Sequence, residues 1–370
     1  MCERAGRHTL LFGVLLLAVS GAPWRVLAQA PLVPEVTAHH GRLLPQYDFL
    51  RPITTDGING VEVAAMWPIR KRDHFNALFN EPERGVSLLY STLGGREHLG
   101  REIAVTYFFR CYYLRRGRFG VYQRFSIGGT YATRPFDERD NFRNVAIATA
   151  PNVHFGSRLG LSADVARRWR LRAGLGFDHL SNANSREPNR GLNYVTAFAG
   201  ATWRMSDTAA QPSSVDVPPV PRGLTAVAAA YFGRKSSKGF DDRYHETVAF
   251  SLEGRYRLRW AWSAAVGADF TYNGAVRPLT EVRRLSYRPR DDYQTGLHVG
   301  PVLHYRRWAF ALQTGAYLGL GDSVGGRRVY NRAVLEFAPV PRLLVRAALR
   351  SHLTVLDFAE VGLGYRVKTW

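Results

Sequence analysis

Residues 169–203 read WRLRAGLGFDHL (169–180), SNANSREPNRG (181–191) and LNYVTAFAGATW (192–203). In the first segment apolar side chains occupy the odd positions from Trp169 to Phe177, and the even positions carry arginine or glycine. This period of two is typical of a β-strand with one apolar face. The third segment also alternates, whereas the middle one is rich in Asn, Ser, Gly and Pro. The stretch therefore predicts two strands joined by a polar loop.

Three polar residues interrupt the apolar face at the loop end of this hairpin. His179 and Ser181 continue the odd row of the first strand, and Asn193 begins the odd row of the second. Residues i and i+2 of a strand share a face about 6.5 Å apart, so the imidazole and the hydroxyl can meet if the chain bends slightly after His179. These groups are capable of acyl-transfer chemistry. Their place on a surface that favours lipid indicates that the substrate is itself a lipid.

The first 30 residues have the parts of a secretory signal. Arg4 and Arg7 give a basic start, residues 10–19 form a short apolar run, and Ala28-Gln29-Ala30 is a small-x-small cleavage site. We therefore expect cleavage after Ala30. Cys111 is then the one cysteine left, which excludes a disulfide framework and a cysteine-rich metal site in the mature chain.

The formal net charge of +20 indicates an anionic partner. Behind an export signal, lipopolysaccharide phosphates or anionic lipids fit this charge better than nucleic acid does. The histidines show no metal-ligand spacing, and the sequence has no glycine-rich phosphate loop. We therefore expect neither a metal nor a cofactor.

Alternating segments recur from Ile58 to the end of the chain, and no stretch after the signal has 18 consecutive apolar residues. Tight turns alternate with longer polar loops, which is typical of outer-membrane β-barrels with periplasmic turns and extracellular loops. A secreted β-sandwich is the alternative. It is disfavoured because a sandwich does not need aromatic residues at the ends of so many outward rows.

The expected fold is an all-β, antiparallel transmembrane barrel of roughly 14–16 strands, or alternatively two 8-stranded halves. A weak similarity between residues 172–181 and 346–354 is consistent with a duplication. The expected organisation is a signal peptide (1–30), an irregular N-terminal lead-in with a short strand at 46–53 (31–57), a barrel half (58–205), a Pro/Ser-rich linker (206–222) and a second barrel half (223–370).

The hairpin resembles the PagL-type outer-membrane lipid A 3-O-deacylases, also described as acyloxyacyl hydrolases. The matching residues are His179, Ser181-Asn182-Ala183, Pro188-Asn189, Gly191, the polar position Asn193 and the closing Trp203-Arg204-Met205. The resemblance is specific over residues 169–203 and looser upstream as far as Gly60. The second half resembles the extension of the family's larger variants.

The resemblance implies that Ser181 is the nucleophile and His179 the general base, on the outer surface of a β-barrel. The family pattern has a glutamate where this chain has Asn193. An amide oxygen can orient an imidazole, but it cannot stabilise the imidazolium with a full charge. Glu187 is the alternative third member of the triad.

The sequence has two further carboxylates that bear on the same role. Asp178 is expected to point to the opposite face by parity, and Glu360 of the second half is a remote candidate. Asn182, Asn189 and the backbone N–H groups of the loop, which also contains Asn184, are the pool of oxyanion donors. Arg186 and Arg190 are candidates for holding lipid A phosphates.

These observations predict an outer-membrane esterase that removes an ester-linked acyl chain from lipid A, with its active site at the extracellular rim. The alternative is a non-enzymatic barrel, such as a porin, an adhesin or a structural protein, with a decayed deacylase site. The sequence leaves the oligomeric state and the role of the second half open.

Overall fold

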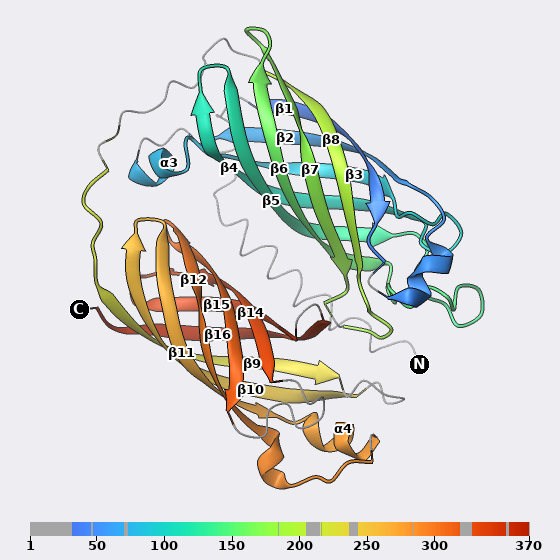
Figure 1. Ribbon diagram of the computed structural model, residues 1–370, viewed down its shortest axis with the longest axis vertical. Helices are drawn as coiled ribbons and strands as arrows, with labels where there is room; N and C mark the ends of the chain where they lie inside the picture. Colours follow the sequence, from blue (N-terminus) through green and yellow to red (C-terminus); the bar gives the residue numbers. More distant parts are fainter. Residues whose placement is uncertain are drawn as a thin grey trace.

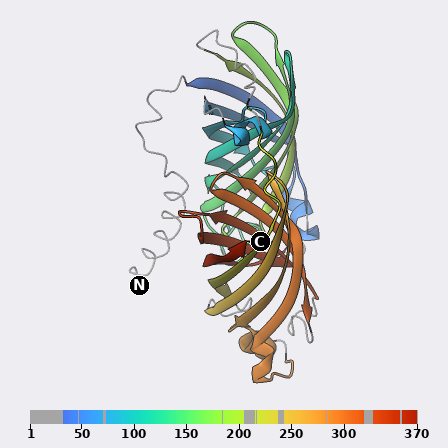
Figure 2. The same cartoon turned by 90° about the vertical axis from the view of Figure 1, so that its left-hand side faces the viewer.

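The computed structural model describes residues 32–45, 47–69, 73–183, 185–204, 215, 217–236, 243–282, 284–318, 328–352 and 355–369. The expected signal peptide, most of the expected linker and Asn184 lie outside these residues. The described chain forms two closed antiparallel barrels of eight strands each (Figures 1 and 2). Of the two arrangements that the sequence left open, the pair of 8-stranded barrels is therefore correct and a single large barrel is wrong.

The N-terminal barrel consists of β1 (Val33–Leu43), β2 (Ile58–Pro68), β3 (Glu83–Thr92), β4 (Arg101–Arg116), β5 (Phe119–Ala132), β6 (Pro151–Asp164), β7 (Trp169–Ser181) and β8 (Leu192–Trp203). The C-terminal barrel consists of β9 (Leu224–Ser236), β10 (Tyr244–Arg259), β11 (Trp262–Asn273), β12 (Tyr293–Tyr305), β13 (Trp308–Leu318), β14 (Val329–Phe337), β15 (Leu343–His352) and β16 (Val355–Thr369). The short helices are η2 (Asp48–Ile53), α3 (His74–Leu78), α4 (Val276–Val282) and η3 (Pro289–Asp292).

Each barrel is closed by pairing of its first and last strands. β1 pairs with both β2 and β8, and β9 pairs with both β10 and β16. Closure within each half means that β8 has no edge left for β9, so the halves are separate barrels and no strand edge of either is exposed. Each barrel satisfies the backbone hydrogen bonding that a membrane requires.

The lead-in that we expected to be irregular contains the first strand. Residues 33–43 form β1, and the short strand expected at 46–53 is instead the 3-10 helix η2. The alternation in β1 is hard to recognise because its outward row carries few apolar residues besides Val36 and Ala38. The N-terminal barrel therefore begins well before Ile58.

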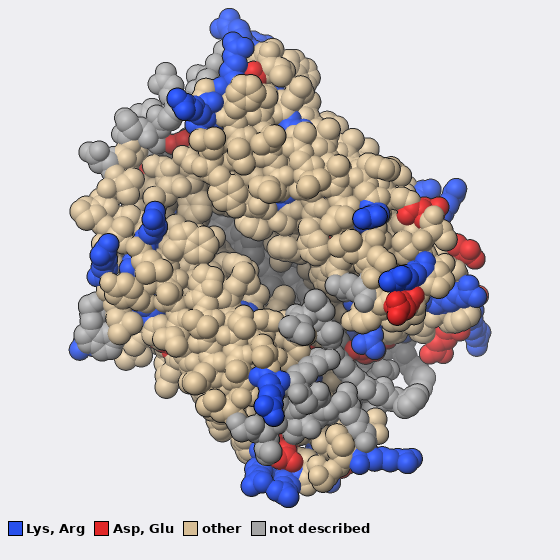
Figure 3. All heavy atoms as spheres, viewed as in Figure 1, with Lys and Arg blue, Asp and Glu red and all other residues tan. Residues whose placement is uncertain are grey.

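The outward faces of both barrels are apolar. In β7 the odd-numbered residues face outward and include the exposed side chains of Trp169, Leu171, Leu175 and Phe177. The exposed apolar side chains on the outward face of β10 include Phe250, Leu252, Tyr256 and Leu258. A space-filling view shows an uncharged surface between the two charged ends (Figure 3). This is the surface of a barrel that spans a membrane.

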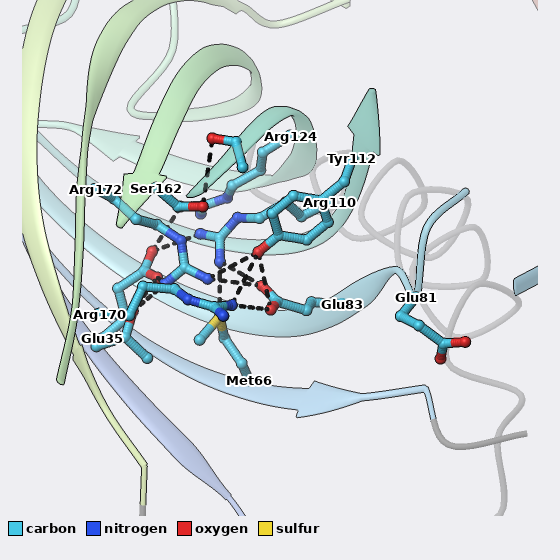
Figure 4. A network of polar contacts seen from close by, with 12 residues as sticks. Glu35, Met66, Glu81, Glu83, Arg110, Tyr112, Arg124, Ser162, Arg170 and Arg172 are labelled. Carbon is cyan, nitrogen blue, oxygen red and sulfur yellow. Dashed lines mark hydrogen bonds and ion pairs between the residues drawn. The ribbon is translucent and has the colours of Figure 1, made fainter. Parts of the chain in front are cut away.

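The interior of the N-terminal barrel is filled by ion-paired side chains (Figure 4). Arg110 contacts Glu35 at 2.6 Å and Glu83 at 2.8 Å, and Arg172 contacts the same two carboxylates at 2.5 and 2.9 Å. All four side chains are buried. Each buried charge loses its contact with water and needs a counter-charge to offset that penalty. Removing one member of the network is therefore expected to leave an uncompensated buried charge inside the barrel.

The interior of the C-terminal barrel also contains a network of buried ion pairs, formed by different residues. Arg346 contacts Glu253 at 2.7 Å, and Arg255 contacts both Glu253 and Glu336, at 2.8 and 3.0 Å. Among the described residues, buried arginines, carboxylates and aromatic rings fill both interiors, in contrast to the polar, water-filled lumen of a porin. Glu360 belongs to this interior and lies 3.7 Å from Arg350, not near the hairpin of residues 169–203.

The two ends of each barrel differ. One end, the long-loop end, carries the connections after β1, β3, β5, β7, β9, β11, β13 and β15. The other, the turn end, carries the connections after the even-numbered strands, of which β4–β5, β6–β7, β10–β11 and β12–β13 are tight. None of the described helices is long and apolar enough to cross a membrane.

The barrels contact each other at their turn ends. Arg306, in the turn after β12, pairs with Asp73 at 2.7 Å, and Tyr305 donates to the Asn76 side-chain oxygen at 2.9 Å. Aromatic rings surround these polar contacts: Trp260 lies 4.3 Å from His74 by ring centroids, and Tyr305 packs on Phe79 and Phe109. The contact surface of the N-terminal barrel is therefore α3 and the adjacent end of β4, which lies opposite β8 on the eight-strand ring.

Candidate active site

His179, Ser181 and Asn193 form one chain of hydrogen bonds at the long-loop end of β7 and β8. His179 and Asn193 are direct partners in the strand register. His179 Nδ1 lies 2.7 Å from Asn193 Oδ1, and His179 Nε2 lies 3.1 Å from Ser181 Oγ. Since the amide oxygen can only accept, Nδ1 carries the proton and Nε2 presents its lone pair to the serine hydroxyl. This is the tautomer that a general base for Ser181 needs.

The three side chains lie on the outward, apolar row of the hairpin. They continue the row of Leu175 and Phe177, both of which are exposed to the lipid side. Ser181 and Asn193 are 8% and 6% exposed, and His179 is half-buried. The group is therefore reached from the barrel's outer surface, at the level where the apolar band meets the long loops.

The residues on the opposite face of the same strands hold the hairpin from inside. Asp178 is fully buried and contacts Arg158 at 2.8 Å and His154 at 3.1 Å. Tyr194, its cross-strand partner, donates a hydrogen bond to Glu102, which also contacts His154. Parity placed Asp178 on the inner face, and the structure confirms that placement. This interior network fixes the register that puts His179 opposite Asn193.

Asn182 is committed to the fold of the loop. Its side-chain N–H donates to the Arg186 carbonyl at 2.8 Å, its side-chain oxygen accepts from the Ser185 N–H at 3.1 Å, and its own N–H donates to Asn189 Oδ1 at 3.2 Å. The bond to Arg186 uses one of the two side-chain N–H groups, so the loop fixes the orientation of the Asn182 amide. Asn189 uses its side-chain oxygen and its backbone N–H in the loop, while its side-chain N–H₂ makes no hydrogen bond with the described residues.

Glu187 is also committed to the loop. Its Oε2 accepts the Asn189 N–H at 3.1 Å, so it caps the loop chain and does not reach the imidazole. The structure thus brings Asn193, and not Glu187, against His179 Nδ1. Arg186 and Arg190 are exposed on the same loop, and the Arg190 guanidinium lies 5.9 Å from the Tyr47 ring.

The connection between β1 and β2 supports the site, which the sequence did not reveal. Leu44 N–H donates to the Asn193 carbonyl at 2.7 Å, and Tyr47 stacks on Phe49 beside Arg190. Beneath these residues an apolar cluster closes the long-loop end of the barrel, and it consists of Leu43, Leu50, Ile53, Ile58, Leu93, Leu99, Ala132, Ala146, Ile147, Leu180, Leu192 and Tyr194. The i, i+3 spacing of Leu50 and Ile53 was the available signal for a short helix with one buried face.

Gly191 positions the imidazole from the far side of the loop. Its φ is +71°, and a Cβ built on it would lie 3.0 Å from His179 Cε1 and 3.2 Å from the Leu180 carbonyl oxygen. Its N–H donates to the Ala146 carbonyl at 2.9 Å, so the backbone cannot easily move away. Glycine is required here for both its conformation and the space it leaves.

Gly191→Ala is therefore expected to displace the imidazole and to lower the turnover of an ester substrate by about tenfold, with little loss of barrel stability. The measurement is kcat with a soluble ester and with lipid A, beside heat-modifiable migration on gels. Gly129→Ala is the matched control, because a Cβ there meets nothing within 4 Å. Equal rates for the two variants would contradict a positioning role for Gly191.

Comparison with known proteins identifies both halves of the chain. The family model described as lipid A 3-O-deacylase (PagL) matches residues 59–202, and the model described as acyloxyacyl hydrolase, C-terminal domain, matches residues 224–369. No curated protein matches the chain significantly.

Several solved structures of outer-membrane proteins match the chain at low similarity. Neisserial surface protein A matches with 10% identity and a TM-score of 0.33, covering 47% of this chain and 97% of its own. The outer-membrane enzyme PagL matches with 14% identity and a TM-score of 0.32, covering 45% and 97%. The siderophore receptor PirA from Acinetobacter baumannii matches with 9% identity and a TM-score of 0.25, covering 92% and 75%.

The two family models divide the chain between them as the two barrels do, and the hydrogen-bonded hairpin lies inside the first match. The chain belongs to the family of PagL-type lipid A 3-O-deacylases, in the larger variant that carries the acyloxyacyl hydrolase C-terminal domain.

Proposed function

We propose that this protein is an outer-membrane esterase that hydrolyses an ester-linked acyl chain of lipid A by nucleophilic attack of Ser181. Membership of a lipid A deacylase family supports the substrate class. The observation that carries the mechanism is the hydrogen-bond chain Ser181–His179–Asn193 on the lipid-facing surface. An ester carbonyl near the membrane surface reaches such a site without leaving the membrane.

The chemical steps follow from the tautomer of His179. Ser181 Oγ attacks the ester carbonyl carbon while His179 Nε2 accepts the hydroxyl proton. The tetrahedral intermediate collapses, the bond between the acyl carbon and the sugar oxygen breaks, and the imidazolium returns the proton to the departing sugar oxygen. A water molecule, deprotonated by His179, then attacks the acyl carbon, the bond to Ser181 Oγ breaks, Oγ takes the proton back from the imidazolium, and a fatty acid is released. The lipid A leaves with a free hydroxyl, which in this family is the one at position 3.

Asn193 and Asn189 serve different parts of this reaction. Asn193 holds the Nδ1 proton of His179 and so keeps Nε2 free to act as the base, although it provides no negative charge for the imidazolium. The Asn189 side-chain N–H₂ and the N–H groups of the loop are the first candidates for oxyanion donors, since the loop fixes the orientation of the Asn182 amide. Oxyanion donors of this kind usually contribute a large part of the rate.

In this proposal the site lies at the extracellular rim of the outer membrane. Outer-membrane barrels have long loops outside and short turns in the periplasm, and the site lies at the long-loop end. The C-terminal barrel contacts α3 and β4, opposite β8, so it leaves the site open to the bulk membrane. Lipid A, which occupies the outer leaflet, then approaches Ser181 laterally.

Arg186 and Arg190 are exposed beside this approach and hold the lipid A phosphates in this proposal. Arg186→Ala combined with Arg190→Ala is expected to raise the KM for lipid A about fivefold at low salt, and less at high salt, with kcat little changed. Initial rates against lipid A concentration at two salt concentrations measure this. Arg139→Ala with Arg143→Ala, on a neighbouring long loop, is the control. A fall in kcat at unchanged KM would contradict the assignment.

The function itself is tested by the lipid A of cells with and without the protein. We expect the mass spectrum to lose one hydroxyacyl unit when the wild-type protein is produced, and to stay intact when an inactive Ser181 variant is produced at the same level in the outer membrane. Identical spectra in all three cases would reject the esterase and leave a non-enzymatic barrel. Of the non-enzymatic alternatives, a porin is disfavoured by the ion-paired interiors.

A further inference from the structure

The turn end of the two barrels carries a one-sided distribution of exposed charge. We call six of its exposed basic side chains the turn-end rim, and they are Arg116, Arg118, Arg222, Arg259, Arg307 and Arg342. They lie in or beside the β4–β5, β10–β11, β12–β13 and β14–β15 turns and just before β9. The rim therefore extends across both barrels.

No acidic side chain described at this end balances the rim at the surface. Asp73 and Asp164 are largely buried and already paired, with Arg306 and with Arg170 and Arg204 respectively, while Glu81 is half-buried. Glu83 and Glu336 belong to the interior networks. The positive charge of the rim therefore faces outward from the turn end, without an exposed acidic neighbour among the described residues.

The long-loop end is different, because exposed charges of both signs alternate there. Its exposed acidic side chains include Asp48, Asp56, Glu97, Asp137, Glu138, Asp140 and Glu281. Figure 3 shows the same contrast, with blue and red mixed along the right-hand edge and mainly blue at the top and left. Basic side chains are exposed at both ends, so the two ends differ in their acidic side chains, which are exposed only at the long-loop end among the described residues.

Exposed aromatic side chains lie directly beside the rim on the outward rows. Tyr113 and Phe119 flank the β4–β5 turn, Trp169 and Trp203 flank the next turns, and Trp262 follows the β10–β11 turn. Aromatic rings in such positions mark the boundary between hydrocarbon and headgroups. The arginines immediately beyond them are therefore at headgroup level, within reach of phosphate groups.

We propose that the turn-end rim is a binding surface for anionic glycerophospholipids of the leaflet on that side, phosphatidylglycerol being the simplest. Guanidinium groups bind phosphodiesters through paired, charge-assisted hydrogen bonds. A basic side chain near an anionic membrane surface contributes roughly fivefold in affinity. Because the rim spans both barrels, such lipids hold the pair together and set its depth. This surface is separate from Ser181 and does not depend on the proposed esterase reaction.

The test uses the full-length protein in a non-ionic detergent, titrated with phosphatidylglycerol or with phosphatidylcholine and followed by native mass spectrometry. We expect phosphatidylglycerol to bind at least about tenfold more tightly, with the preference reduced at high salt. The variant carrying Arg116→Gln, Arg118→Gln, Arg259→Gln and Arg307→Gln is expected to lose most of this preference. These four side chains are exposed and take no part in the interior networks.

The matched control removes the same number of charges from the long-loop end, as Arg139→Gln, Arg143→Gln, Arg284→Gln and Arg290→Gln, and is expected to keep the preference. Heat-modifiable migration verifies that both variants are folded. Lipid A titration and excess inorganic phosphate distinguish other sources of phosphate, and neither is expected to depend on the rim. Equal affinity for the two phospholipids, an equal loss in the control variant, or a rim variant that loses lipid A instead would overturn the proposal.

Discussion

Ser181→Ala is expected to lower kcat for lipid A deacylation at least about a thousandfold while the barrel still inserts and folds. The change removes the proposed nucleophile, and no other hydroxyl is hydrogen-bonded to His179 in the described structure. Binding is expected to change little, because in the proposed binding mode the acyl chain lies on the apolar outward row and the phosphates contact Arg186 and Arg190. Single-turnover rates with purified protein and lipid A in mixed micelles, beside the KM, measure the separation of chemistry from binding.

Ser185 provides the matched control for this experiment. It lies exposed on the same loop, and its backbone N–H, not its side chain, bonds to Asn182. Ser185→Ala is therefore expected to turn over at close to the wild-type rate. Undiminished turnover by Ser181→Ala would end the acyl-transfer mechanism, whereas equal losses in both variants would indicate damage to the loop.

The fold class could be predicted from alternation because a membrane barrel sorts its side chains strictly. Leu171 and Arg172 differ by one position, yet one faces lipid and the other pairs with Glu35 at 2.5 Å inside. Where the outward row lacks large apolar residues, as in β1, alternation does not reveal the strand. The inner row of β1 carries Glu35, Thr37 and His39, whose burial comes from partners on distant strands. Those partners could not be recognised locally.

Alternation also could not decide between one barrel and two. It specifies which face each residue occupies but not which strand pairs with β8. That choice depends on β1, whose residues were assigned to the lead-in, and on the closure of each eight-strand ring. The interior ion pairs reflect this division, since Arg172 pairs within the first barrel and Arg346 within the second.

At the site, parity predicted which groups share a face but not which donors stay available. His179, Ser181 and Asn193 are brought together by the period of two and the pairing of β7 with β8. The hydrogen bonds of Asn182 and Glu187 depend on the backbone path of the loop. The Asn182 side chain bonds to the Arg186 carbonyl and the Ser185 N–H, and the Glu187 carboxylate accepts the Asn189 N–H. The sequence of an Asn-rich loop contains many hydrogen-bond donors, and only the folded structure shows which of them bond within the loop.

The identity of the third member gives the second prediction. Asn193→Ala is expected to lower kcat about a hundredfold with little change in KM, because the imidazole loses the acceptor that fixes its tautomer. Glu187→Ala is expected to cost far less, since Glu187 caps the loop through the Asn189 N–H and does not touch His179. Rates of both variants with lipid A, measured beside folding assays, decide between the two residues. The reverse ranking would move the orienting role to Glu187.

Asn193→Glu tests the same assignment in the opposite direction. A carboxylate at this position restores the residue of the family pattern and places a negative charge beside the imidazolium that forms when Ser181 loses its proton. The charge stabilises that intermediate state, so kcat is expected to rise severalfold above the wild type. Asn193→Gln matches the glutamate in side-chain length but not in charge. A rise in kcat that came only from the longer side chain would therefore appear in both variants. A rise in the glutamate variant only would assign the limitation of the natural protein to the missing charge, and a fall in both would show that Asn193 is held at a length the site requires.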